Sequence, residues 1–129
     1  PFRRRVINSK LALHELIAPI KREGKAIYGV GAPARSTTLI SYVGLDDGIV
    51  DCVLEVKGSR KIGRYVPGTN IPVLDEAKLF VDQPPYALVL SWHIADELCR
   101  NLRKKGYRGD FIVPLPSPRL VRNREIAAA

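Results

Sequence analysis

The chain has 129 residues, of which 46% are hydrophobic and 26% charged, and its formal net charge is +8 at pH 7. This length and composition are typical of a single folded domain. No run of 18 apolar residues occurs, so we expect no membrane span and a cytoplasmic protein. The basic residues are dispersed and do not alternate with aromatic ones, which argues against nucleic-acid binding. Most of this charge is expected on solvated helix faces, and such a field would also attract a phosphate-bearing small molecule.

Two features of the composition concern cysteine and methionine. Cys52 and Cys99 lie in apolar segments without the spacing of a metal site, so we expect two reduced thiols in the core. The chain begins Pro-Phe-Arg and contains no methionine. Either the start was removed by processing or the chain is a piece of a longer protein, and we favour the second.

Strand and helix signals alternate along the chain. A helical pattern covers residues 9–23, where Pro19 should kink or shorten the helix and Gly24 should stop it. Later helices are expected after Pro33, from Asp75 to Phe80, and from residue 94 to Gly106. Buried strands are predicted from apolar, β-branched segments at residues 25–30, 49–56, 86–92 and 111–116, the last completing the sheet.

This alternation predicts an α/β architecture, a mainly parallel sheet of about five strands with helices on both faces. Right-handed crossovers place the loops that follow the strands at one edge of the sheet, where ligands of such sheets bind. Three polar stretches should fall on that edge: residues 29–38, 55–69 and 91–97.

The first stretch is a glycine turn. Gly29, Gly31 and Ala34 fit the spacing G-x-G-x-x-(G/A) between a strand and a helix. Such a turn lets the backbone approach a pyrophosphate, and the helix that follows presents N–H groups to it. The alternative is a tight turn whose small residues only permit packing.

Polar residues around the turn strengthen the phosphate interpretation. Arg35 adds a positive charge and Ser36 a hydroxyl donor just after the turn. Glu55 follows Ala34 by about 20 residues, the place where dinucleotide-binding folds put the acid that holds a ribose.

The second stretch is the polar loop of residues 57–72, which is long for a passive connection. Lys61, Arg64 and Tyr65 precede Pro67-Gly68-Thr69, a turn that would aim these side chains in one direction. Cations beside the glycine turn suit a diphosphate, and a tyrosine can stack on a base or sugar. The alternative is a solvated loop.

The third stretch is SWHIADE, residues 91–97. Ser91 or His93 is expected to cap the helix that begins there, and Trp92 is the only tryptophan. His93 could shuttle a proton, but without a neighbouring nucleophile a capping or ligand-orienting role is favoured. His14, on the first helix, is expected at the surface or in packing.

Together these stretches resemble one family, the C-terminal domain of the S-adenosylmethionine-dependent sugar C-methyltransferases. The resemblance covers about residues 25–119 and is carried, in the family's order, by YGVGAPARSTTLISYVG, KIGRYVPGTNIPV, LVLSWHIADEL and FIVPLPSPR. It implies a Rossmann-like, three-layer domain over residues 25–119, a linker and N-terminal helix over 1–24, and a tail over 120–129.

The resemblance also implies a division of labour. S-adenosylmethionine, zinc and the catalytic base would belong to other parts of a longer chain, with no cofactor in this one. This domain would pack on the central methyltransferase domain of the same chain and bind a nucleotide-diphosphate sugar. The candidate substrate-binding residues are Gly29, Gly31, Ala32, Ala34, Arg35, Ser36, Glu55, Lys61, Arg64, Tyr65, Thr69 and His93.

Three residues depart from the family pattern: Arg35 stands where lysine is common, Glu55 where aspartate is common and His93 where asparagine is frequent. These differences leave the sugar undefined. Two alternatives remain, a free-standing NAD(P)- or nucleotide-binding module and an interaction domain that binds no small ligand.

Overall fold

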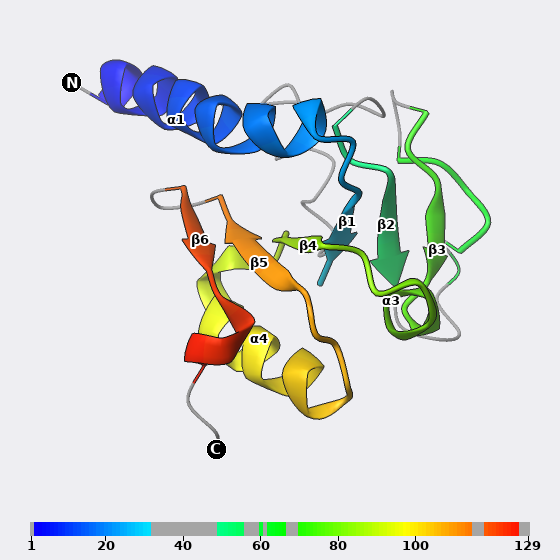
Figure 1. Ribbon diagram of the computed structural model, residues 1–129. Helices are drawn as coiled ribbons and strands as arrows, with labels where there is room; N and C mark the ends of the chain where they lie inside the picture. Colours follow the sequence, from blue (N-terminus) through cyan, green and yellow to red (C-terminus); the bar gives the residue numbers. More distant parts are fainter. Residues whose placement is uncertain are drawn as a thin grey trace.

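A computed structural model (Figure 1) describes residues 2–31, 49–55, 60, 62–66, 70–114 and 118–126. The helix expected after Pro33 lies outside these residues. The described elements, in chain order, are α1 (Phe2–Arg22), β1 (Ile27–Val30), β2 (Cys52–Glu55), β3 (Val73–Asp75), α3 (Ala77–Asp82), β4 (Tyr86–Val89), the 3-10 helix η1 (Trp92–Ile94), α4 (Ala95–Lys104), β5 (Asp110–Val113), β6 (Arg119–Val121) and the 3-10 helix η2 (Asn123–Glu125).

The strands form one sheet in the order β3-β2-β1-β4-β5-β6. Neighbouring strands from β3 to β5 are parallel, and β6 pairs antiparallel with β5. The predicted Rossmann-like α/β fold with a mainly parallel sheet is confirmed. The order reverses between β1 and β4, which makes the junction of these two strands the switch point of the sheet.

Side chains alternate between the two faces of the sheet, so the domain has three layers. On one face, Ile27, Val53 and Leu88 pack with Leu13 and Ile17 of α1. The opposite face packs against α3 and α4, and its buried cluster includes Val30, Cys52, Leu79, Val89, Cys99, Leu102 and Phe111. Figure 1 shows α1 apart from α3 and α4 across the sheet.

The first helix is longer than predicted. It continues through Pro19 and ends at Arg22, so the expected early end is wrong. The predicted stop at Gly24 is confirmed: its φ is +73°, its N–H donates to the carbonyl of Lys21, and the N–H of Lys25 donates to that of Ile20. These two bonds form a Schellman motif, which satisfies carbonyl groups at the helix end.

The helices predicted from Asp75 and from residue 94 are confirmed with small shifts. The carboxylate of Asp75 accepts a hydrogen bond from the backbone N–H of Ala77 at 2.8 Å, and α3 runs on to Asp82 rather than Phe80. Helix α4 ends at Lys104, just before the predicted stop at Gly106. None of the described helices is both long and apolar enough to cross a membrane.

The sheet does not end with residues 111–116, contrary to the prediction. Strand β6 adds to its edge, and Asn123 behind it is buried, donating to the carbonyls of Tyr107 and Gly109 at 2.9 and 2.8 Å. The carboxylate of Asp110 accepts from the backbone N–H of Asn123 and pairs with Arg122. This last segment is held by these polar contacts together with the partly buried Leu120, Val121 and Ile126, which pack against the core.

Candidate functional site

The loops after β1 and β4 meet at the switch point. The N–H of Leu90 donates to the carbonyl of Val30 at 2.9 Å, and the hydroxyl of Ser91 donates to the carbonyl of Gly31. The expectation that Ser91 or His93 caps the helix is wrong, because neither η1 nor α4 has a side-chain cap and the Ser91 hydroxyl is used between the loops. The serine therefore joins two loops that are far apart in the sequence.

Both glycines of the turn are placed in close packing. Gly31 has a φ of +65°, and a Cβ there would lie 2.5 Å from Cδ2 of Leu98 in α4. A Cβ on Gly29 would lie 3.1 Å from Leu90 Cδ1 and 3.2 Å from Val53 Cγ2. Gly31 is favoured by its positive φ and by the close approach of Leu98, whereas at Gly29 a Cβ would need its neighbours to move by a few tenths of an ångström; both observations support the packing alternative. A contact with the substrate stays a prediction.

An open pocket of about 300 Å³ lies beside this junction. It is lined by Trp92, His93, Ile94, Ala95, Asp96, Glu97, Arg100 and Arg119. Most of these residues come from η1 and the start of α4, directly after β4. Arg119 joins them because β6 is antiparallel: it pairs with Val113, the last residue of β5. The first residue of β6 therefore lies at the carboxyl edge of the parallel strands.

Among the described residues that line the pocket, the charges are balanced. Arg119 pairs with Asp96 at 3.6 Å, and Asp96 and Glu97 occupy the first turn of α4. Arg100 follows one turn later and makes no ion pair within the part of the chain that the structure describes. The carboxylates lie where the helix dipole favours negative charge, so this helix end is already neutralised and has little attraction for a phosphate.

The pocket also presents apolar surface to solvent. Trp92 and Ile94 are exposed, and the ring of His93 meets that of Trp92 edge-on with 5.8 Å between centroids. An exposed aromatic ring beside hydrogen-bonding side chains is suited to a ligand that has both a flat face and polar edges.

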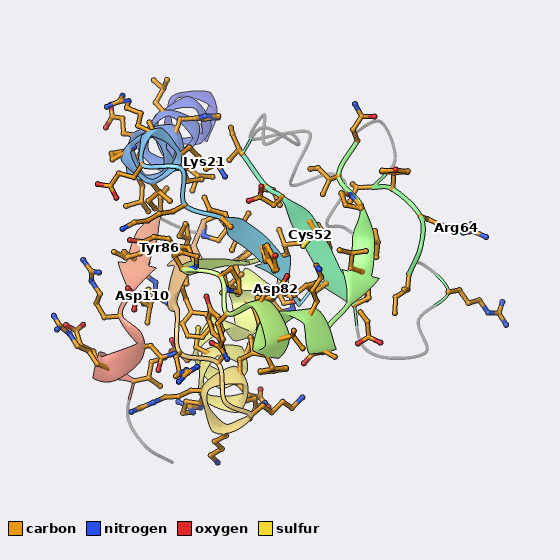
Figure 2. All side chains as sticks on the ribbon, turned by 45° about the vertical axis from the view of Figure 1, so that its right-hand side comes forward. Lys21, Cys52, Arg64, Asp82, Tyr86 and Asp110 are labelled. Carbon is orange, nitrogen blue, oxygen red and sulfur yellow. The ribbon has the colours of Figure 1, made fainter. Side chains whose placement is uncertain are left out.

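The structure does not bring all of the predicted residues together. The N–H of Val73 donates to the carbonyl of Arg64 at 2.7 Å, so Arg64 and Tyr65 lie along the outer edge of β3. Gly29 is in register with Val53, and Val53 with Val73. Arg64 is thus three strand spacings, roughly 14 Å, from the backbone of Gly29. Figure 2 shows its side chain pointing away from the sheet. The expectation that these cations lie beside the glycine turn is wrong for Arg64.

The remaining predicted residues divide into two groups. Glu55 ends β2 at the carboxyl edge, in register with Asp75 of β3, and His93 lies in the pocket. The others lie outside the described residues: Ala32, Ala34, Arg35, Ser36, Lys61 and Thr69. Their part in substrate binding stays a prediction.

The described residues contain no group of three or more histidine, cysteine, aspartate or glutamate side chains that could hold a metal ion. Cys52 and Cys99 are buried on the same face of the sheet, and burial raises the pKa of each thiol to about 12. A protonated thiol is a poor metal ligand and a poor nucleophile. Neither cysteine is suited to hold zinc, and their expected role as core thiols is confirmed by their burial.

Of the eight described residues that line the pocket, only His93 is among the candidate substrate-binding residues predicted from the sequence. Trp92 stands out only as the single tryptophan, and Arg100 and Arg119 receive no role. Arg119 ends the block FIVPLPSPR, so its position in a recurring block is a usable signal. Its meeting with Asp96 depends on the antiparallel pairing of β6, which the sequence does not predict.

Comparison with known proteins agrees with this fold. The C-methyltransferase C-terminal domain family matches residues 1–116. The C-methyltransferase NovU of Streptomyces niveus is 29% identical over 110 residues, which are 84% of this chain and 26% of NovU. The chain therefore spans about a quarter of the length of this curated relative. Since the family match extends over most of its length, the chain belongs to the family of C-methyltransferase C-terminal domains.

Proposed function

We propose that this domain binds the nucleotide-diphosphate sugar substrate of a C-methyltransferase whose methyl-donor site and catalytic base lie in another domain of a longer chain. The observation that carries the proposal is the open pocket that follows β4, beside the switch point, whose lining includes Trp92, Arg100 and Arg119. Ligands of open α/β sheets bind at this position, outside the carboxyl ends of the strands.

The chemistry of the pocket supports binding rather than catalysis. His93 is exposed and in edge contact with Trp92, which suits orientation of a ligand. The reaction itself would remove a proton next to a sugar carbonyl, and that carbon would then attack the methyl group of S-adenosylmethionine. The base for this step would come from outside the chain, as would the zinc.

Calorimetric titration of the chain with NAD, S-adenosylmethionine and a thymidine- or uridine-diphosphate sugar tests the proposal. We expect heat of binding with the nucleotide sugar and none with the other two ligands. Tight binding of NAD would instead favour a free-standing dinucleotide module. Failure of all three ligands to bind would contradict the proposal and favour an interaction domain.

A second measurement tests the division of labour. The chain alone, mixed with labelled S-adenosylmethionine and the nucleotide sugar, should transfer no methyl group above the rate without protein. Transfer that depends on the chain would show that the base and the donor site lie within it. The titration and this assay are independent, because binding without transfer is the expected combination.

A further inference from the structure

We infer that the Trp92 pocket receives the nucleoside end of the substrate, with the base stacked on Trp92 and the ribose hydroxyls donating to Asp96 and Glu97. The inference rests on the proposed function and adds to it the part of the ligand that this pocket recognises. Three considerations lead to it: the size of the pocket, the balance of charge among its described residues, and the need for the sugar to react with groups outside this chain.

The size limits what the pocket can hold. Small-molecule sites range from about 300 to 1,000 Å³, and this pocket, at about 300 Å³, is at the lower end. A nucleotide sugar has three parts: a nucleoside, a diphosphate and a sugar. The pocket therefore takes one part of the ligand, and the others extend beyond it.

The charges of the pocket argue against the diphosphate as the part of the ligand that it binds. Asp96 and Glu97 offset Arg100 and Arg119, and Asp96 is already paired with Arg119. A dianion placed here would meet two carboxylates at a helix end that they already neutralise. A group without charge, with hydroxyl donors for the carboxylates and carbonyl acceptors for the arginines, fits better.

The exposed ring of Trp92 supplies the remaining contact. Trp92 is 39% exposed although it directly follows the buried Ser91. Stacking on an aromatic face suits every base, since each base has a π face. A sugar can also pack on a tryptophan, so stacking alone does not decide between the nucleoside end and the sugar end of the ligand.

The place where the sugar must react decides between the two ends. Under the proposed function the reacting carbon of the sugar meets a base and a methyl donor outside this chain. The described residues of the pocket, from η1, α4 and β6, supply neither of those groups, so a sugar bound there would still have to reach them outside this chain. The nucleoside, which does not react, is the end that this domain can hold throughout the reaction.

The single tryptophan makes the test direct, because emission excited selectively at the indole reports on Trp92 alone. The chain is titrated separately with thymidine diphosphate, uridine diphosphate, pyrophosphate and glucose 1-phosphate, with calorimetry in parallel. We expect one or both nucleoside diphosphates to quench the emission by about a third or more through stacking. Pyrophosphate and glucose 1-phosphate should leave it unchanged.

Substitution of the ring gives a second measure. Trp92→Ala should weaken the calorimetric affinity for the nucleoside diphosphate about tenfold, and Trp92→Phe should weaken it less. Val81→Ala removes an exposed apolar side chain outside the pocket and serves as the matched control. Circular dichroism confirms that each variant is folded.

The outcomes separate the two proposals. A nucleotide sugar that binds wild type and Trp92→Ala equally, without quenching, overturns the nucleoside assignment and leaves the proposed function standing. Quenching by glucose 1-phosphate but not by the nucleoside diphosphates assigns the pocket to the sugar end and also overturns it. Failure of the nucleotide sugar to bind at all overturns the proposed function, and the nucleoside assignment falls with it.

Discussion

Two regions of the domain carry residues of the kind that bind nucleotides, and they are built differently. At the switch point, Ser91 and Gly31 join two loops beside an open pocket. Along the outer edge of β3, Arg64 and Tyr65 are held through backbone hydrogen bonds, and Tyr65 is 62% exposed. A cation and an aromatic ring near a glycine turn in the sequence therefore do not define a site. The order of the strands determines which loops meet.

The largest expected effect of substitution is at Gly31. Gly31→Ala should lower the free energy of unfolding by about 2–3 kcal/mol, from the positive φ and from displacement of Leu98. The φ is +65°, and the new Cβ would lie 2.5 Å from Leu98 Cδ2. Urea unfolding followed by circular dichroism measures the change.

A control for this effect lies in the other region. Gly63, near the outer edge of β3, has a φ of +91°, and a Cβ added there would meet no atom within 4 Å. Gly63→Ala should therefore cost only the backbone strain, about 1 kcal/mol. In a Leu98→Ala background the cost of Gly31→Ala should fall toward that value. Equal costs at the two glycines would show that packing at the switch point is not tight.

The next effect is a dependence of stability on pH through two buried thiols, one of which, Cys99, lies on α4. Burial raises the pKa of the Cys52 and Cys99 thiols to about 12, against about 8.5 in an unfolded chain. The unfolded chain loses these protons first, so stability present below about pH 8.5 is lost as the pH rises toward 12. Between about pH 9 and pH 10 each thiol should lower the free energy of unfolding by about 1 kcal/mol.

Urea unfolding at about pH 8, 9 and 10 measures this slope. The double variant Cys52→Ala, Cys99→Ala is the control and should show a shallower decline. Identical slopes in the two proteins would mean that the thiols are not shielded from solvent. The measurement reports on the packing of α4 on the sheet, because Cys99 lies on this helix, whose first turn lines the open pocket.

The hydrogen bond between the loops should have a smaller effect. Ser91→Ala removes the hydroxyl that donates to the carbonyl of Gly31 and should cost about 1 kcal/mol of stability. Thermal unfolding measures the loss as a lower midpoint. An unchanged midpoint would show that the hydroxyl contributes little and that the two loops are held by packing and by the backbone hydrogen bond between Leu90 and Val30.

The smallest expected difference is in ligand affinity between the two regions. Arg100→Ala should weaken the affinity for a nucleoside diphosphate about fivefold, by removing a hydrogen-bond donor in the pocket. Arg64→Ala should weaken it less, since Arg64 lies beyond β3. Arg108→Ala, an exposed arginine outside both regions, corrects for the loss of one positive charge. A larger loss of affinity for Arg64→Ala than for Arg100→Ala would place the ligand at the outer edge of β3 and not in the pocket.

The edge of the sheet where the candidate site lies could be predicted from the sequence, but most of the residues that line the site could not. The glycine turn and the segment SWHIADE are both predicted at one edge, and Gly31 and Ser91 do meet there. Arg64 is expected beside them, because the polar loop follows β2 directly. The chain instead returns along β3 and pairs with its first residue, Val73. That Arg64 follows the end of β2 in the sequence does not show that the chain turns back along β3.

The sequence by itself determined the alternation of strands and helices, the parallel sheet, the stop at Gly24 and the resemblance to the family. Each depends on local patterns: hydrophobic period, glycine at a helix end, or a recurring block of residues. Only the tertiary structure decided the places of β3 and β6, which are three residues each and too short for a periodic signal. The meeting of Arg119 with Asp96 follows from the antiparallel pairing of β6. That pairing joins strands close in the chain, with only residues 114–118 between them, but it brings Arg119 to Asp96 on α4, an element distant in the sequence, and no local pattern encodes that contact.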